Sequence, residues 1–242
     1  MSALPKQKIK KPLVIAIDGP AGAGKSTTAK ALAAVLSYLY LDTGALYRAM
    51  TWKIIREKVD PGDLAAIELL CASLDLKLCM TGEETQVWLN GENVTPFLRD
   101  PAVTRLTSSV SALPPVRKKL LAIQKKAGEK GGIIAEGRDI GTVVFPDADL
   151  KFYFDADADV RGKRRSQDLI KQGIDTDVSS TIRDLKARDL KDRSRTLAPL
   201  KKGNDAIIID TTDLNPDEVM QAILKEVVQV CEAAHARVPF PA

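Results

Sequence analysis

Histidine and cysteine are scarce in this chain of 242 residues. The single histidine, His235, lies near the C-terminal end, so neither a Ser-His-Asp triad nor a multi-histidine metal site can be assembled. The three cysteines, Cys71, Cys79 and Cys231, have no C-x-x-C spacing, which excludes zinc ribbons and thioredoxin-like redox sites. Because an odd number of cysteines argues against a disulfide framework, we expect free thiols and a cytoplasmic location.

Long apolar runs and a strong net charge are also missing. No run approaches the roughly 18 residues of a membrane-spanning helix. Lysine and arginine number 36 against 32 for aspartate and glutamate, and the two signs are interleaved, so neither a membrane nor a nucleic acid is an expected partner. Residues 1–11 lack the apolar region of a signal peptide, and we expect a flexible leader there. The 45% apolar and 28% charged content is that of a globular protein.

Five short apolar runs alternate with helical segments along the chain. A parallel five-stranded sheet with helices on both faces accounts for this alternation, so we expect an α/β fold. The runs are residues 13–17, 38–41, 133–135, 150–154 and 206–209. Helical composition lies in residues 27–36, 45–58, 116–127, 157–171, 179–195 and 211–234, the last with Asn215 or Asp213 as its N-cap.

A different pattern interrupts this alternation between the second and third runs. Leu74, Leu76 and Leu78 recur at every second position, which is the period of a half-buried strand. The Asn90-Gly91 pair is a strong signal for a two-residue hairpin turn. We therefore expect a small antiparallel sheet at about residues 74–96, inserted into the α/β chain.

The segment GPAGAGKS, Gly19–Ser26, matches the phosphate-binding pattern G-x-x-x-x-G-K-[ST] between a strand and a helix. Its glycines let successive N–H groups turn toward one anion, and the positive end of the following helix dipole points to the same place. Lys25 is expected to reach the β- and γ-phosphates of ATP, and Ser26 to bind Mg²⁺. A glycine-rich turn with a surface lysine is the competing interpretation. The predicted ATP-binding residues here are Gly19, Pro20, Ala21, Gly22, Ala23, Gly24, Lys25, Ser26 and Thr27.

Arginines follow two further strands at the edge where the phosphate loop lies. LDTGALYR ends at Arg48, and AEGRDIGTVVF carries Arg138 and Asp139. Fixed guanidinium groups there neutralise the crowded charge of two phosphates with bidentate geometry. A third segment, RDLKDRSRTLAPL, places Arg188, Asp192 and Arg195 on one helix face, although a charge run alone is more typical of a solvated helix.

A charged stretch after the fourth apolar run is a candidate lid. It contains three arginines that would close over the triphosphate and exclude water, namely Arg161, Arg164 and Arg165. The alternative is a plain helix in which Asp157 pairs with Arg161 at spacing i,i+4.

Together these segments resemble the bacterial cytidylate (CMP) kinases of the nucleoside monophosphate kinase family, in the same order from about residue 14 to 212. The resemblance implies transfer of the γ-phosphoryl group of ATP to CMP or dCMP, with Mg²⁺. It also implies a kinase domain over residues 12–242, with a phosphate-loop core, a monophosphate-binding insert and a lid. The core would take about residues 12–43, 130–155 and 176–235, the insert about 44–129, and the lid about 156–175.

The resemblance also implies a role for each matching residue. Arg48, Arg138 and Arg195 would hold the acceptor phosphate, and Arg188 and Asp192 would meet the sugar. Thr43 matches an acceptor-site position. The base would be read by Arg117, Asp139 and Ser108, or Ser109 in place of Ser108, because the alignment has few fixed points there. We expect a monomer that stabilises charge through Lys25, Arg138, Asp139 and Arg195 and needs no side-chain nucleophile.

Three other interpretations stay open. The first is a kinase of another acceptor, such as UMP, AMP or shikimate, on the same core. The second is a regulatory module that hydrolyses or senses ATP without an acceptor. The third, a nucleic-acid-binding role, rests on lysines that are more simply a solvated helix face, Lys118, Lys119, Lys125 and Lys126.

Overall fold

The computed structural model describes residues 12–81, 84–171 and 173–236. Its centre is a five-stranded sheet in the order β2-β6-β1-β7-β8, in which every neighbouring pair is parallel. The predicted parallel sheet is therefore confirmed. The strands are β1 (Val14–Asp18), β2 (Leu39–Asp42), β6 (Ile133–Gly137), β7 (Leu150–Asp155) and β8 (Ile207–Asp210).

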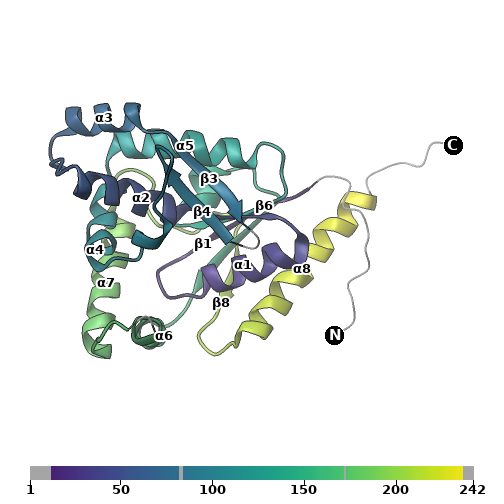
Figure 1. The fold of residues 1–242 in the computed structure, drawn as a ribbon. Helices are drawn as coiled ribbons and strands as arrows, with labels where there is room; N and C mark the ends of the chain where they lie inside the picture. The colour runs from purple at the N-terminus through teal and green to yellow at the C-terminus, as the bar shows by residue number, and fades with distance from the viewer. Residues whose placement is uncertain (1–11, 82–83, 172, 237–242) are drawn as a thin grey trace.

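Helices cover both faces of this sheet (Figure 1). Because side chains alternate along a strand, Ile15 and Ile17 of β1 pack on one face and Ala16 on the other. The first face is covered by α1 (Lys25–Leu36) and α8 (Pro216–Ala236). The second is covered by α2 (Thr43–Arg56) and α5 (Pro114–Gly128). This two-sided burial explains why the strands read as continuous apolar runs.

A segment of about ninety residues is inserted between β2 and β6, which are neighbours in the sheet. It contains the predicted antiparallel sheet, in the order β3-β4-β5. Asn90 and Gly91 form the hairpin turn with φ of 48° and 83°, as a type I′ turn requires. Besides α2 and α5, its elements are α3 (Leu64–Ser73), β3 (Leu76–Thr81), β4 (Glu84–Leu89), β5 (Glu92–Asn93), η1 (Thr95–Phe97) and α4 (Pro101–Val110).

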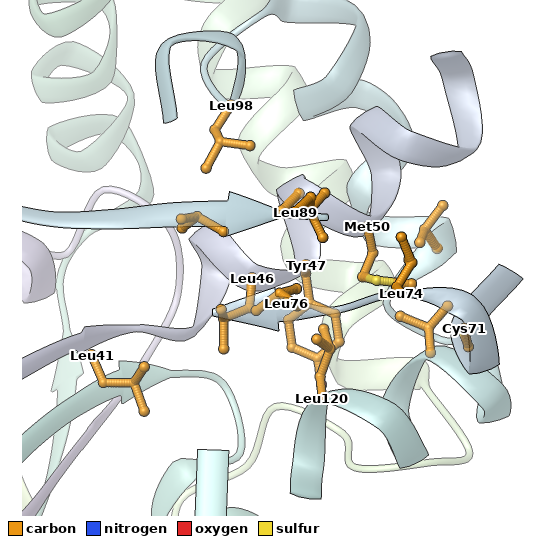
Figure 2. Packing of buried hydrophobic residues seen from close by; sticks show 14 of the residues in the cluster. Leu41, Leu46, Tyr47, Met50, Cys71, Leu74, Leu76, Leu89, Leu98 and Leu120 are labelled. Carbon is orange, nitrogen blue, oxygen red and sulfur yellow. The ribbon is translucent and has the colours of Figure 1, made fainter. Parts of the chain in front are cut away.

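The insert shares a hydrophobic core with the second face of the sheet. Figure 2 shows Met50 of α2, Leu76 of β3, Leu89 of β4 and Leu120 of α5 converging there. All four are buried. The insert and β6 therefore share one hydrophobic core. This core fixes the position of the acceptor-side residues of the insert relative to the phosphate loop.

The first residues of helices α5 and α8 are defined more closely by the structure than by the sequence. Helix α5 begins at Pro114, so both prolines lie in its first turn, where a missing N–H is tolerated. Asn215 is the N-cap of α8, because its side-chain oxygen accepts hydrogen bonds from the N–H groups of Asp217 and Glu218. Glu218 in turn accepts from the Asn215 N–H at 2.8 Å, which completes a capping box.

Helices α6 (Ala158–Lys171) and α7 (Val178–Ser194) pack against each other at one end of the sheet (Figure 1). Their contact is close at Gly162, where a Cβ atom would lie 2.2 Å from Cγ1 of Ile182. Only glycine fits this helix crossing. A single π-helical turn, η2 (Ile140–Val144), follows β6. Among the described residues no helix combines the length and apolar content needed to cross a membrane.

Candidate active site

The phosphate loop joins β1 to α1 and has the backbone that its sequence predicts. Gly22 and Gly24 have φ of 79° and 87°, in the left-handed region that favours glycine. Gly19 approaches β7 so closely that a Cβ atom would lie 2.2 Å from the Phe154 carbonyl oxygen. Gly24 is the N-cap of α1 and offers no side-chain acceptor to the first-turn N–H groups. The start of α1 is therefore an anion-binding position.

Lys25 lies buried over this loop, where its Nζ donates to the Pro20 carbonyl at 2.6 Å. Burial lowers the pKa of Lys25, and the nearby Arg138 lowers it further, whereas Glu136 and Asp18 raise it. A buried ammonium group next to a guanidinium group is stabilised by an anion between them. Phosphate oxygens in the loop would supply that negative charge.

Two buried carboxylates beside the loop were not among the predicted site residues. Glu136 of β6 accepts from the Tyr40 hydroxyl at 2.6 Å and from the Ser26 hydroxyl, while burial raises its pKa. Asp18 of β1 accepts from the N–H groups of Ile140 and Gly141, each at 2.7 Å, and burial raises its pKa to about 6. Asp18 therefore ties η2 to the phosphate loop, and Glu136 lies beside the predicted magnesium ligand.

Asp192 of α7 organises the acceptor side. Its carboxylate accepts from Arg138 Nε at 2.9 Å, from the Arg195 guanidinium, and from the Ser108 hydroxyl at 3.2 Å. Asp192 is almost completely buried, and the surrounding arginines hold its pKa below the usual range in spite of that burial. Three predicted acceptor residues therefore meet at one carboxylate. Asp184, earlier on the same helix, is exposed.

The arginines in this cluster outnumber the carboxylates that pair with them. Arg48 pairs with Asp42 at 2.7 Å. Arg188 is partly buried, and desolvation of its guanidinium, with Arg138 and Arg48 nearby, lowers its pKa to about 10. Among the described residues, the buried Nε atoms that find no hydrogen-bond partner include those of Arg48, Arg188 and Arg195. The cluster has the surplus charge and unused donors that an anionic ligand requires.

A second ion pair joins the insert to the turn after β6. Arg117 of α5 pairs with Asp139, and both side chains are largely buried. The Arg117 guanidinium also donates to the Ser111 carbonyl at 3.2 Å and lies over the Tyr47 ring at 5.7 Å. Burial raises the pKa of Asp139, and Arg117 opposes that rise. The pair presents one donor group and one acceptor group held in fixed orientation.

Two smaller predicted residues also lie at this site. Ser108 is buried against Asp192, whereas Ser109 is exposed one position further along α4. This placement favours Ser108 of the two candidate serines. The Thr43 hydroxyl donates to the Glu136 carbonyl at 2.7 Å, which joins the start of α2 to β6.

The three predicted lid arginines have different environments. Arg161 pairs with Asp189 and not with Asp157. The Asp157 carboxylate instead accepts hydrogen bonds from the N–H groups at the start of α6. Arg164 donates to the hydroxyl and carbonyl of Thr211, in the loop after β8. Arg165 lies toward the acceptor cluster, where Arg48 and Arg99 add to the effect of burial in lowering its pKa.

Most of the chain is similar to proteins of one known family. The family model described as cytidylate kinase matches residues 15–229. The chain belongs to the cytidylate kinase family. It is 44% identical over 223 residues to the cytidylate kinase of Syntrophotalea carbinolica, covering 91% of this chain and 95% of the relative. It is 45% identical over 215 residues to the cytidylate kinase of Geobacter sp. strain M21, covering 89% and 92%.

The family membership makes this protein an ATP-dependent nucleoside monophosphate kinase. A solved gluconokinase from Sinorhizobium meliloti matches the cytidylate kinase fold with a TM-score of 0.50 and 11% identity, over 94% of this chain and 98% of the other. At that identity the likeness concerns the fold alone.

The sequence predicted the arginines of this site but not several carboxylates that lie beside them. These carboxylates are the buried Asp18, Glu136 and Asp189 and the partly buried Asp42. Three of them end or nearly end an apolar run, and that position was the available signal. Asp189 had no such signal, because it lies inside a charge run that is typical of a solvated helix.

Proposed function

We propose that this cytidylate kinase transfers the γ-phosphoryl group of ATP to CMP and dCMP, giving CDP and dCDP. The observation that carries the proposal is the cluster of surplus arginines beside the phosphate loop, adjoining the buried Arg117–Asp139 pair. The arginine cluster can bind the phosphate of an acceptor molecule, and the Arg117–Asp139 pair can form hydrogen bonds to a base. A nucleoside monophosphate joins the two.

On the donor side, the loop N–H groups and the start of α1 bind the triphosphate, and Lys25 contacts its β- and γ-phosphates. The residues present fit Mg²⁺. The Ser26 hydroxyl lies beside the Glu136 carboxylate. The described residues hold no cluster of three or more metal-ligating side chains, and Mg²⁺ usually needs only one or two protein groups besides phosphate oxygens and water. Bound Mg²⁺ supplies positive charge to the β- and γ-phosphate oxygens.

On the acceptor side, Arg48, Arg138 and Arg195 hold the CMP phosphate. Asp192 orients the last two, because it accepts hydrogen bonds from both. Arg188 and Asp192 together face the sugar. Arg188 also adds its charge to this arginine cluster, since Arg138 and Arg48 are close enough to lower its pKa.

Cytosine suits the base site for reasons of hydrogen-bond polarity. The Asp139 carboxylate and the Ser108 hydroxyl accept from the amino group at N4, and Arg117 donates to the ring acceptors at N3 and O2. Uracil carries an oxygen at position 4 and a proton at N3, so a carboxylate would face an oxygen. The protein is therefore expected to prefer CMP and dCMP over UMP.

The transfer itself needs no side-chain nucleophile or general base. An oxygen of the CMP phosphate, already ionised, forms a bond to the γ-phosphorus while the bond to the β–γ bridging oxygen breaks and ADP leaves. Lys25, Arg138 and Arg195 hold the two phosphates in line and stabilise the charge between them. The lid arginines on α6, Arg164 and Arg165, exclude water from the site.

The test is ADP release from ATP and Mg²⁺ in a coupled assay with CMP, dCMP, UMP, AMP, GMP and shikimate as acceptors. Turnover mainly with CMP and dCMP supports the proposal. A better rate with another acceptor refutes the assignment of the base-reading residues and leaves the kinase class intact. ATP hydrolysis that is indifferent to every acceptor favours the regulatory-module interpretation instead.

The proposal extends to the setting in which the enzyme works. We expect a monomer in the cytoplasm that binds nucleotides and no nucleic acid. Lys118, Lys125 and Lys126 are exposed on α5, as a solvated helix face requires. Light scattering after size-exclusion chromatography tests the monomer, and the absence of DNA or RNA binding at low salt tests the second expectation.

A further inference from the structure

Helix α7 carries a carboxylate that faces the phosphate loop rather than the acceptor. Asp189 lies next to Arg188 in sequence, yet its Oδ2 contacts the Arg161 guanidinium of α6 at 2.5 Å. Both side chains are almost completely buried. Its other oxygen, Oδ1, lies 3.5 Å from the Ala21 backbone nitrogen in the phosphate loop. Asp189 therefore contacts both the loop and the helix that covers it.

Arg161 lies against the same part of the loop. Its guanidinium donates to the Ala21 carbonyl at 3.0 Å and to the Ala156 carbonyl at 2.9 Å. The backbone of Arg161 also lies close to Gly22, because a Cβ atom there would be 2.9 Å from the Arg161 carbonyl oxygen. Arg161 thus fixes the middle of the loop with its side chain and its main chain, and Asp189 balances its charge.

This contact sets the direction of one loop N–H group. In a trans peptide the carbonyl and the following N–H point in opposite directions. Because the Ala21 carbonyl is turned toward Arg161, the N–H of Gly22 is turned to the opposite side. The glycines of the loop permit many other backbone conformations, so an external contact is needed to hold this one.

We propose that Asp189 is a positioning residue for ATP: through Arg161 it holds the Ala21–Gly22 peptide in the orientation in which the loop binds phosphate. This inference rests on the proposed function, because it assumes that the triphosphate binds in this loop. Arg161 then acts mainly through the loop backbone. The same helical turn of α7 carries acceptor-side Arg188 and Asp192, so one helix supports both substrate sites.

A second α6–α7 ion pair offers a matched control. Lys186 of α7 pairs with Asp159 of α6 at 3.2 Å, and both side chains are more than half exposed. This pair joins the same two helices without any hydrogen bond to the phosphate loop in the part of the chain that the structure describes. Asp159→Asn therefore removes an α6–α7 ion pair and leaves the Ala21 contact in place.

The experiment compares Asp189→Asn with Asp159→Asn and the wild type. Calorimetry measures the dissociation constants of inorganic tripolyphosphate, of a non-hydrolysable ATP analogue with Mg²⁺, and of CMP. Because hydrogen bonds to charged groups are strong, we expect Asp189→Asn to weaken tripolyphosphate and the ATP analogue by about tenfold each. In Asp189→Asn the dissociation constant of CMP should stay within about twofold of the wild-type value. In the control, Asp159→Asn, all three dissociation constants should stay within about twofold, because surface substitutions usually have effects of that size. Steady-state kinetics should show the same rise in the KM for ATP.

A double variant keeps the test decisive if Asp189→Asn does not fold. Arg161→Met with Asp189→Leu replaces the buried pair by apolar side chains of similar volume, which proteins often tolerate without loss of stability. It should melt close to the wild type and still show the weakened tripolyphosphate binding. Unchanged tripolyphosphate affinity in a folded variant, or an equal loss for CMP, overturns the inference. Failure of the wild type to phosphorylate CMP refutes the proposed function instead, because tripolyphosphate binding is measured separately.

Discussion

Replacement of Asp139 by asparagine should change the choice of base more than it changes the fold. Asparagine has nearly the same shape and still offers an oxygen to Arg117, but it loses the charge and gains an N–H donor. The side chain is 6% exposed, so water does not screen its contact with a base. The substitution therefore isolates the electrostatic part of base recognition.

The magnitude follows from the two hydrogen-bonding partners at position 4 of the base. A hydrogen bond to a buried charged group contributes about 2 kcal/mol, so kcat/KM for CMP should fall by about 30-fold. For UMP the repulsion between the carboxylate and the base oxygen disappears, which should raise kcat/KM by roughly fivefold, or about 1 kcal/mol. Together the preference for CMP over UMP should fall by about 150-fold.

The coupled ADP-release assay measures both values on the same preparation. Asp184→Asn, on the exposed side of α7, is the control and should leave both kcat/KM values and their ratio unchanged. If Asp139→Asn lowers the rates with CMP and UMP by equal factors, Asp139 supports the site without reading the base, and the reasoning is wrong.

Three other predictions concern stability. Arg188→Met should raise the free energy of unfolding by on the order of 1–3 kcal/mol, because it removes a partly buried guanidinium whose pKa desolvation lowers to about 10. It should also raise the KM for CMP; urea unfolding and steady-state kinetics check the two effects. Burial raises the folded-state pKa of Asp18 to about 6, so the wild type should lose roughly 3 kcal/mol of stability relative to Asp18→Asn as the pH rises from about 3 to about 7. Urea unfolding at several pH values measures the difference. Gly162→Ala should destabilise the protein by about 1–3 kcal/mol, because the new methyl group would overlap Ile182, and a lower Tm would show it.

The sequence predicted those parts of the fold that depend on residues close together in the chain. The five strands are apolar on both faces, the phosphate loop needs glycines at defined positions, and the Asn90-Gly91 turn needs positive φ. Helices α3 and α4 were not predicted. Their apolar faces are defined by packing within the insert.

Contacts between distant segments were the part that sequence could not supply. The i,i+4 rule offered Asp157 as the partner of Arg161, but the actual partner is Asp189, 28 residues further along the chain. Likewise, the charge run of α7 resembles a solvated face, yet Asp189 and Asp192 are buried because α6 and the acceptor arginines cover them. Burial of a charged residue depends on what packs over it, and that information is not local.

The position of the insert between β2 and β6 has a consequence for how such enzymes diversify. The chain leaves the sheet after Asp42 and re-enters it in the adjacent strand, where Leu39 is in register with Ile133. Changes of length or sequence within the insert therefore leave the pairing of β6 with β1, and the donor loop beside it, intact. The insert carries Arg48, Ser108 and Arg117 of the acceptor side. Evolution or a protein engineer can therefore alter these contacts to the molecule that receives the phosphoryl group while the ATP-binding loop is retained.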